Sequence, residues 1–243
     1  MYIHTEDPLA IAAVEAIHTG NVQELKRLLA KNPDLSRARL GTSQCGTSRT
    51  LLHVATDWPG HFPNGAATVV ALIEAGADVN ARFTGPHTET PLHWAASSDD
   101  VEALDALIDA GADIEATGGV IGGGTPLADA GAFAQWNAAR RLVERGAHTT
   151  LNDAATLGLI DRLEGYFASG SLPEPDDVNR AFWYACHGRQ QRTAEYLLAR
   201  GANLNWIPGW EKVTPLDAAR RSEAGALVEW LRSHGAKSAE ELG

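Results

Sequence analysis

Short apolar runs alternate with polar segments along this chain, and several of the runs are closed by glycine in the same way. An apolar stretch followed by Gly-Ala and a polar residue stands at residues 73–78, 108–113, 143–148 and 198–203. Glycine at such a place adopts the left-handed conformation with which helices commonly end. Each of these endings therefore predicts the C-terminal end of a helix.

The apolar runs also begin alike, with Thr followed by Pro or Leu and then an Ala-rich stretch. This opening stands at Thr50, Thr90, Thr125 and Thr214. A threonine hydroxyl can accept a hydrogen bond from a free N–H group at a helix start, and proline in the first turn has no N–H to leave unsatisfied. Each unit therefore begins with a threonine helix start and ends with a glycine helix stop. This pattern predicts two helices joined by a turn, that is, one helical hairpin per unit.

The glycines recur at a nearly fixed spacing. Gly76, Gly111 and Gly146 follow one another at intervals of 35 residues, and Gly235 follows Gly201 by 34. Such a period is typical of a stack of repeated units, in which each unit buries its apolar face against its neighbours. We therefore expect an elongated repeat array.

Residues 90–95 read Thr-Pro-Leu-His-Trp-Ala, which resembles the Thr-Pro-Leu-His-x-Ala signature of ankyrin repeats. Partial copies and Gly-Ala-Asp endings extend the resemblance over almost the whole chain. The resemblance implies an all-α solenoid of stacked helix-turn-helix units with β-hairpin fingers between them. We expect a single domain, 1–243, with seven units, of which the first and fifth are divergent. The units are expected near residues 9–35, 50–82, 90–116, 125–148, 149–170, 178–205 and 214–237.

Composition narrows the function classes. The net charge of −11 argues against a nucleic-acid partner, because phosphate binding needs clustered Lys and Arg. The N-terminal residues do not form a signal peptide, and no apolar run reaches membrane-spanning length, so we expect a cytoplasmic chain without membrane contact. Cys45 and Cys186 are too few for a disulfide framework and are not spaced for a metal site. No cofactor is expected, and a monomer is the default.

Three segments depart from the repeat pattern by insertion. The link 36–49 is long and rich in small polar residues, and the link 117–124 contains five glycines. Both are expected to be fingers beside the groove, the glycine-rich one a plain flexible finger. Residues 57–65 interrupt a helix pair with two prolines, two glycines and three rings. There, Trp58 and Phe62 could contact a partner or fold back on the helices, and the sequence favours neither alternative.

A fourth departure is a deletion. Only a few residues separate Gly146 from Thr149, so no finger fits between the fourth and fifth units. A gap between long fingers favours a pocket, whereas a continuous row of fingers favours an extended protein surface. We expect access to the inner helices at this interruption.

Side chains on the first helix of each unit should line the groove. The residue after the His of the signature, and those three and four places further along, share one face. This register and the following fingers give the expected binding residues, which are Trp58, Trp94, Ser97, Asp129, Phe133, Asp153, Tyr184, His187, Trp206 and Trp210. The set places aromatic rings around two carboxylates and an imidazole.

Two functions fit this set. In the first, the chain is a non-catalytic scaffold that holds a protein or peptide partner in its concave groove, as the resemblance implies. In the second, an aromatic-lined pocket holds a small molecule, on which Asp129, Asp153 and His187 act by proton transfer. An acid early in an inner helix more often caps that helix, and no nucleophile or cofactor motif supports catalysis. We expect the scaffold.

Two further groups have simple structural interpretations. His53 and His93 stand at the His of the signature, where the resemblance implies a bond to neighbouring backbone that joins repeats. Asp99 and Asp100 occupy the turn where the family commonly has Gly-His. This acidic pair is expected to be exposed and solvated.

Overall fold

The structure, a computed structural model, describes residues 1–42, 46–168 and 172–243. Cys45 and Gly170, the latter at the end of the expected fifth unit, lie outside the described residues. The chain divides into two compact units, Met1–Ala147 and His148–Gly243. The division falls within the short link after Gly146, where no finger was expected to fit.

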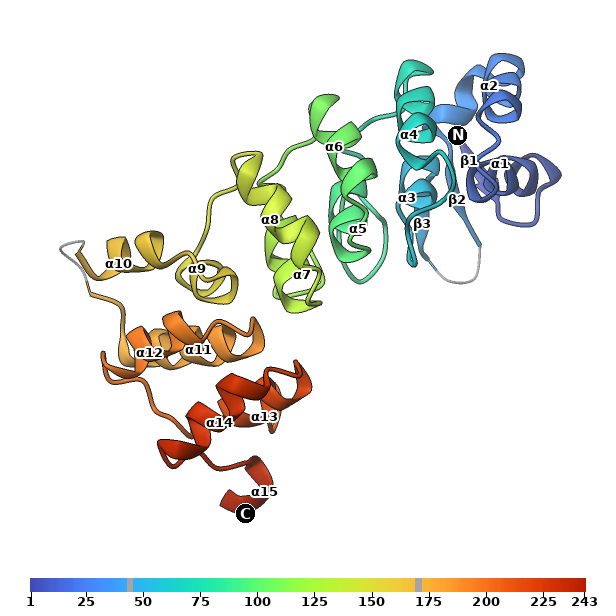
Figure 1. The fold of residues 1–243 in the computed structure, drawn as a ribbon. Helices are drawn as coiled ribbons and strands as arrows, with labels where there is room; N and C mark the ends of the chain where they lie inside the picture. Colours follow the sequence, from blue (N-terminus) through green and yellow to red (C-terminus); the bar gives the residue numbers. More distant parts are fainter. Residues whose placement is uncertain (43–45, 169–171) are drawn as a thin grey trace. The chain divides into compact units, whose positions relative to one another are not determined.

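Helix pairs build the first unit (Figure 1). In chain order its elements are β1 (Tyr2–His4), α1 (Pro8–His18), α2 (Val22–Lys31), the 3-10 helix η1 (Pro33–Arg37), β2 (Arg39–Gly41), β3 (Ser48–Thr50), α3 (Leu51–Ala55), α4 (Gly65–Glu74), α5 (Pro91–Ser97), α6 (Val101–Asp109), α7 (Pro126–Ala132) and α8 (Trp136–Glu144). The first helices of successive pairs pack together in one row, α1 on α3, α3 on α5 and α5 on α7. The second helices form a parallel row in the same order.

The second unit repeats this arrangement. Its elements are α9 (Leu151–Leu157), α10 (Ile160–Ala168), α11 (Pro175–His187), α12 (Gln191–Leu198), α13 (Pro215–Arg221), α14 (Gly225–Ser233) and α15 (Ala239–Leu242). Helix α11 packs between α9 and α13. It begins at Pro175, ahead of the unit start expected near residue 178, because proline at the first helical position lacks an N–H to satisfy. The all-α prediction of stacked helical pairs is confirmed.

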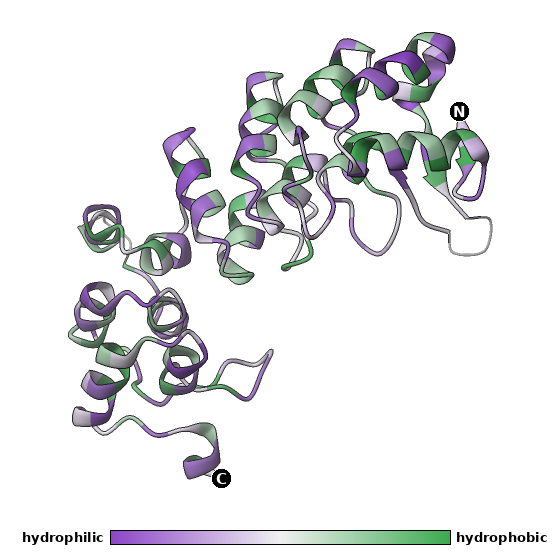
Figure 2. Ribbon diagram, turned by 45° about the vertical axis from the view of Figure 1, so that its right-hand side comes forward, coloured by the Kyte–Doolittle hydropathy of each residue, from purple (hydrophilic) through white to green (hydrophobic). Residues whose placement is uncertain are grey.

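The helix ends follow the chemistry of the sequence. The hydroxyls of Thr50, Thr125 and Thr214 accept hydrogen bonds from backbone N–H groups in the first turns of α3, α7 and α13. Gly76 and Gly111 have φ of 94° and 90°, a conformation that favours glycine. Figure 2 shows hydrophobic and hydrophilic stretches alternating along the helices. Most of the buried apolar side chains of the chain are alanine and leucine.

The fingers differ from one another in structure. Strands β1, β2 and β3 form one sheet in that order, with β1 parallel to β2 and β3 antiparallel to it. A bridge between Ser48 and Thr84 joins this sheet to the following finger. The glycine-rich link closes on itself through backbone bonds from Gly118 to Gly123 (2.9 Å) and from Gly119 to Gly124 (3.0 Å).

The inserted loop after α3 is fixed on both sides. The backbone N–H of His61 donates to the Asp100 carboxylate at 2.8 Å, and the side-chain amide of Asn64 donates to the Gly20 carbonyl at 3.0 Å. The Phe62 ring stacks on His18, with the ring centroids 4.5 Å apart. Of the two alternatives for this loop, Phe62 therefore folds back onto the first repeat. Trp58 stays 78% exposed.

The expectation that Asp99 and Asp100 are solvated is wrong. Asp100 is buried, and it caps α6 by accepting from the Ala103 N–H at 3.0 Å. Asp99 accepts from the backbone N–H of Ala138 and from the Asn137 side chain, both at 2.7 Å, and so caps α8 of the next repeat. The turn is exposed in an isolated repeat, but the neighbouring repeats on either side cover these carboxylates with donors.

Replacing Asp100 with alanine should lower the free energy of unfolding of the first unit by about 2 kcal/mol, because a helix cap and a charged hydrogen bond are lost together. Urea denaturation followed by circular dichroism measures this loss. Asp100→Asn retains a capping oxygen and should lose less, and Glu102→Ala, at an exposed position of the same helix, is the control. An Asp100→Ala protein as stable as the control would show that the hydrogen bonds of Asp100 to the N–H groups of His61 and Ala103 do not stabilise the fold.

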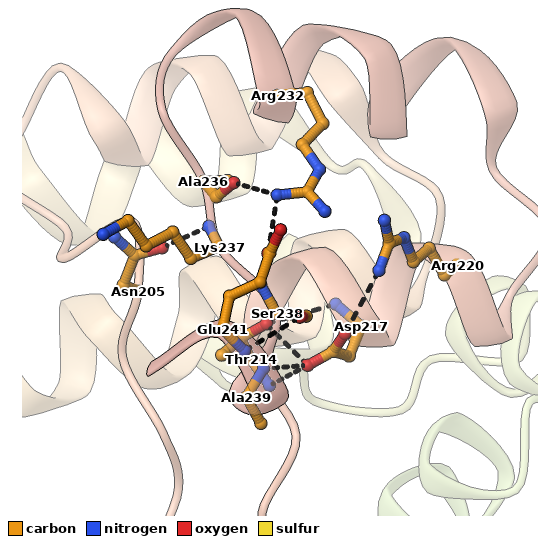
Figure 3. Close-up of polar contacts among 10 residues, drawn as sticks. All are labelled: Asn205, Thr214, Asp217, Arg220, Arg232, Ala236, Lys237, Ser238, Ala239 and Glu241. Atoms are coloured by element: carbon orange, nitrogen blue, oxygen red, sulfur yellow. Dashed lines mark hydrogen bonds and ion pairs between the residues drawn. The ribbon is translucent and has the colours of Figure 1, made fainter. Parts of the chain in front are cut away.

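The C-terminal residues pack onto the last repeat (Figure 3). The Asp217 carboxylate accepts from the N–H groups of Thr214 (3.2 Å) and Ala239 (2.7 Å), and Arg232 pairs with Glu241 at 2.7 Å. This Arg232 guanidinium lowers the pKa of Glu241 to about 2. Helix α15 thus covers the end of the array with polar contacts. Among the helices that the structure describes, none has the length and apolar character to cross a membrane.

Candidate functional site

A cleft of about 370 Å³ opens in the first unit, between the second, third and fourth repeats. Five segments of the array contribute to it, namely the inserted loop after α3, the two fingers that precede α5 and α7, and the ends of these two helices. The lining residues are Asp57, Trp58, Glu89, Trp94, Ser97, Ser98, Val120, Phe133 and Gln135. Four of the expected binding residues, Trp58, Trp94, Ser97 and Phe133, therefore share one cleft.

The aromatic rings of the cleft are held to different degrees. Trp94 packs edge-on against the buried His53 ring, with centroids 5.0 Å apart, and lies 5.5 Å from the Phe83 ring. Trp58 and Phe133 are 78% and 43% exposed, respectively. The Trp94 ring is thus packed against neighbouring rings, whereas the rings of Trp58 and Phe133 are exposed and could contact a ligand.

Glu89 is the buried acid of the cleft, and it was absent from the residues expected from the sequence. It ends the finger before Thr90, its backbone carbonyl lies 3.1 Å from His53 Nε2, and the residue is only 7% exposed. Burial raises the pKa of its carboxyl, and the negative charge of Asp129 raises this pKa further. The Trp94 indole and His87 oppose the shift. The only sequence signal was an acid directly before a Thr-Pro helix start.

Asp129 faces the protein interior instead of offering its carboxylate to the groove. It is fully buried, and its carboxylate accepts from the backbone N–H groups of Val120 (3.3 Å) and Ile121 (3.0 Å). A side chain at Gly119 would collide with this carboxylate, since a Cβ there would lie 2.5 Å from an oxygen of Asp129. Burial raises the pKa of Asp129, and the two backbone donors oppose the shift. The glycine-rich link is therefore a finger whose backbone is hydrogen-bonded to Asp129 of α7.

In the second unit, the four ring-bearing residues expected there gather in one cluster around Trp183. Trp210 lies 5.7 Å from Trp206 and 6.3 Å from Tyr184 between ring centroids. The buried His187 ring is stacked on Trp183 at 5.5 Å. Arg180 lies over Trp210 at 6.0 Å and Arg221 over Trp183 at 5.6 Å, so arginines of the chain already cover this cluster.

The residues of the acid–base alternative come from both units. Asp129 belongs to the first, and Asp153 and His187 belong to the second. Asp153 is the third residue of α9 and completes a capping box with the N-cap Thr150, because its carboxylate accepts from the Thr150 N–H at 2.8 Å and from the Thr150 hydroxyl at 2.7 Å. Each of the three thus has a structural role within its own unit. Their meeting in one catalytic pocket stays a prediction.

His53 and His93 join repeats. In both, Nδ1 accepts from the N–H of the preceding Thr, at 3.3 Å from Thr50 and 3.1 Å from Thr90. The Nε2 atoms lie 3.1 Å from the carbonyls of Glu89 and Gly124, which directly precede the next repeats. These partners require a proton on Nε2 of a neutral imidazole. Burial lowers the pKa of both rings to about 4.

A metal-binding group of side chains and a reactive cysteine are two further kinds of site that the described part of the chain could contain. No group of three or more His, Cys, Asp or Glu side chains in it is arranged to hold a metal ion. Cys186 is a buried free thiol whose pKa is raised by burial. The cleft of the first unit is therefore the place where exposed rings and a buried carboxyl group lie together.

Comparison with known proteins agrees with this architecture. Residues 63–153, which include most of the cleft, match the family model described as ankyrin repeats in three copies. The curated proteins contain no match to the chain. Among solved structures, the chain is similar to the crystal structure of the human ASB11 ankyrin repeat domain, with a TM-score of 0.54 and 22% identity. The similarity covers 98% of this chain and 92% of that chain, and at this identity it speaks for the fold.

Proposed function

Because this chain is an ankyrin-repeat protein, we propose that it is a non-catalytic scaffold whose first unit binds a peptide segment of a protein partner. Ankyrin repeats generally mediate protein–protein interaction. The observation that carries the proposal is the cleft between the second, third and fourth repeats, lined by Trp58, Trp94 and Phe133. Large rings beside a pocket are the side chains that most often dominate the binding energy of protein interfaces.

The two fingers that border this cleft support an extended ligand. Both are fixed by the array itself, the earlier one through His53 and the later one through Asp129. A surface whose parts are already ordered loses little conformational entropy when a partner binds. The exposed ring of Trp58, at the edge of the cleft, then has an apolar face available for the partner. We place the peptide along α5 and α7, across these fingers.

The substitution Trp58→Ala tests this proposal. Peptides selected from a random phage-displayed library on the immobilised full chain should bind the variant about 30-fold more weakly, the equivalent of about 2 kcal/mol for the loss of a tryptophan that contacts the peptide. Isothermal titration calorimetry with the synthesised peptides measures the change. Trp58 is largely exposed, so its removal should leave the melting temperature unchanged.

Trp210→Ala is the matched control, because Trp210 is an exposed tryptophan of the second unit. It should leave peptide affinity unchanged. Affinity that survives Trp58→Ala and falls with Trp210→Ala would overturn the proposal, since the peptide would then be bound by the second unit.

A further inference from the structure

We propose that the cleft of the first unit takes an arginine side chain of the partner, with Glu89 as its counterion and with Trp58, Trp94 and Phe133 around the guanidinium. This inference rests on the proposed function, since it names the group of the bound peptide that the cleft recognises. It also makes a separate claim, because an aromatic cleft could serve an apolar peptide equally well.

Glu89 is the first observation behind this inference. The residue is 93% removed from solvent and lines the cleft. Within the residues that the structure describes, its carboxylate makes no ion pair with Lys or Arg. A buried carboxylate destabilises the fold unless a cation or several donors compensate it. A ligand cation that enters the cleft would supply the missing charge.

A hydroxyl group in the same cleft also lacks a partner. Ser97 Oγ is buried and forms no hydrogen bond with any described residue. Ser97 follows Trp94 by one helical turn on α5, so the hydroxyl and the indole share one wall of the cleft. The hydroxyl can accept a bond from an N–H group, and a guanidinium has five such donors in one plane.

The aromatic rings of the two units differ in their cationic neighbours. In the second unit, Arg180 and Arg221 lie over Trp210 and Trp183, and Arg200 lies 3.2 Å from the centre of the Tyr196 ring. In the described part of the first unit, no arginine or lysine lies over a ring of the cleft. Arginine side chains thus lie over aromatic rings of the second unit, whereas the rings beside Glu89 are open to a cation from a ligand.

Charges around the cleft favour a cation over an anion. The negative charge of Asp129 lies near enough to Glu89 to raise its pKa, whereas the hydrogen bond of the Trp94 indole and the nearby His87 lower this pKa. The Asp57 carboxylate at the rim pairs with Arg49, so that pair carries no net charge. Guanidinium fits better than ammonium, because it is planar, stacks on rings and can meet a carboxylate with two parallel bonds.

Nuclear magnetic resonance titrations with acetyl-arginine amide, acetyl-lysine amide and acetyl-citrulline amide test the assignment. Citrulline has nearly the shape of arginine and no charge. At constant ionic strength, the arginine derivative should shift the indole N–H signals of Trp58 and Trp94 at millimolar concentration. The citrulline and lysine derivatives should bind at least tenfold more weakly. Equal affinity for citrulline would overturn the charge pairing, and equal affinity for lysine would overturn the choice of guanidinium.

Glu89→Gln is the decisive variant. It should weaken the arginine derivative at least tenfold, and the melting temperature should not fall, because Gln keeps the shape and removes a buried ionisable group. Glu102→Gln, at an exposed position of α6, should change neither quantity. Unchanged arginine affinity in a folded Glu89→Gln protein would overturn the inference.

The two proposals fail in different ways. If selected peptides depend on Trp58 but bind Glu89→Gln as tightly as the unsubstituted protein, the peptide site stands and the arginine assignment fails. If the arginine derivative binds through Glu89 but no selected peptide depends on Trp58, the proposed peptide function fails while the cation site stands.

Discussion

Replacing Gly188 with alanine is expected to lower the free energy of unfolding of the second unit by about 3 kcal/mol or more, the upper range for an overpacked interior. Gly188 follows α11, where that helix packs against α9. A Cβ at this position would lie 2.0 Å from the Thr156 carbonyl oxygen and 2.8 Å from its carbon. Both are backbone atoms of the preceding repeat, so no rotation of a side chain relieves the overlap.

Urea denaturation measures this loss, and hydrogen exchange of the α9 and α11 amides locates it. Gly165→Ala is the matched control in the same unit, since a Cβ at Gly165 would meet nothing within 4 Å. That control should raise stability by up to about 1 kcal/mol, because alanine favours a helix interior over glycine. If both variants are equally stable, α9 and α11 are not in the close contact described here.

His93→Ala should have the second large effect, a loss of about 3 kcal/mol in the first unit at pH 7, from a buried cavity and unsatisfied backbone groups. The side chain is fully buried, and it links the Thr90 N–H to the Gly124 carbonyl. Its loss removes a hydrogen bond that joins the third repeat to the fourth. His4→Ala, at an exposed position of the same unit, is the control and should cost little.

The cost of His93→Ala should shrink in acid. Because the pKa of His93 is lowered from 6.5 to about 4, the unfolded chain takes up a proton between these pH values and the folded chain does not. The histidine's contribution is therefore present above pH 6.5 and is lost as the pH falls toward 4, at about 1.4 kcal/mol per pH unit. At pH 5 the variant should be only about 1 kcal/mol less stable than the unsubstituted protein.

Urea denaturation of both proteins at pH 7 and pH 5 checks this convergence. Glu89 and Asp129, whose pKa values are raised by burial, act in the opposite direction. Their stabilising contribution is lost as the pH rises through the raised pKa values. They are present in both proteins, so their effect largely cancels in the difference. A difference that stays constant from pH 7 to pH 5 would contradict the neutral, buried state of His93.

Some of the site could be predicted from the sequence because it depends on helix periodicity. Trp94 and Ser97 stand one turn apart on α5. Phe133 directly follows α7, as Ser98 directly follows α5. Their presence in one cleft follows from the register of the repeats. The inter-repeat bonds of His53 and His93 were also expected, because the resemblance to ankyrin repeats implies that a histidine at this place bonds to the backbone of the next repeat.

Other parts of the site depend on contacts that no single repeat contains. Asp129 matched Trp94 in register, yet its carboxylate turns to the N–H groups of a finger that the glycines bring unusually close. Asp100 sits in a turn that local chemistry exposes, and an insertion 39 residues earlier covers it. Glu89 gave almost no local signal, and it becomes buried only in the array, where its carbonyl meets His53 of the preceding repeat.

By itself, the sequence determined where helices begin and end, since threonine caps, first-turn prolines and terminal glycines act within a few residues. Repetition of those signals determined the stacked array. The tertiary structure alone decided which acids are buried, which rings share a cleft and which of them keep free faces. Burial and electrostatic pairing depend on residues one repeat away or more, and only packing brings these together.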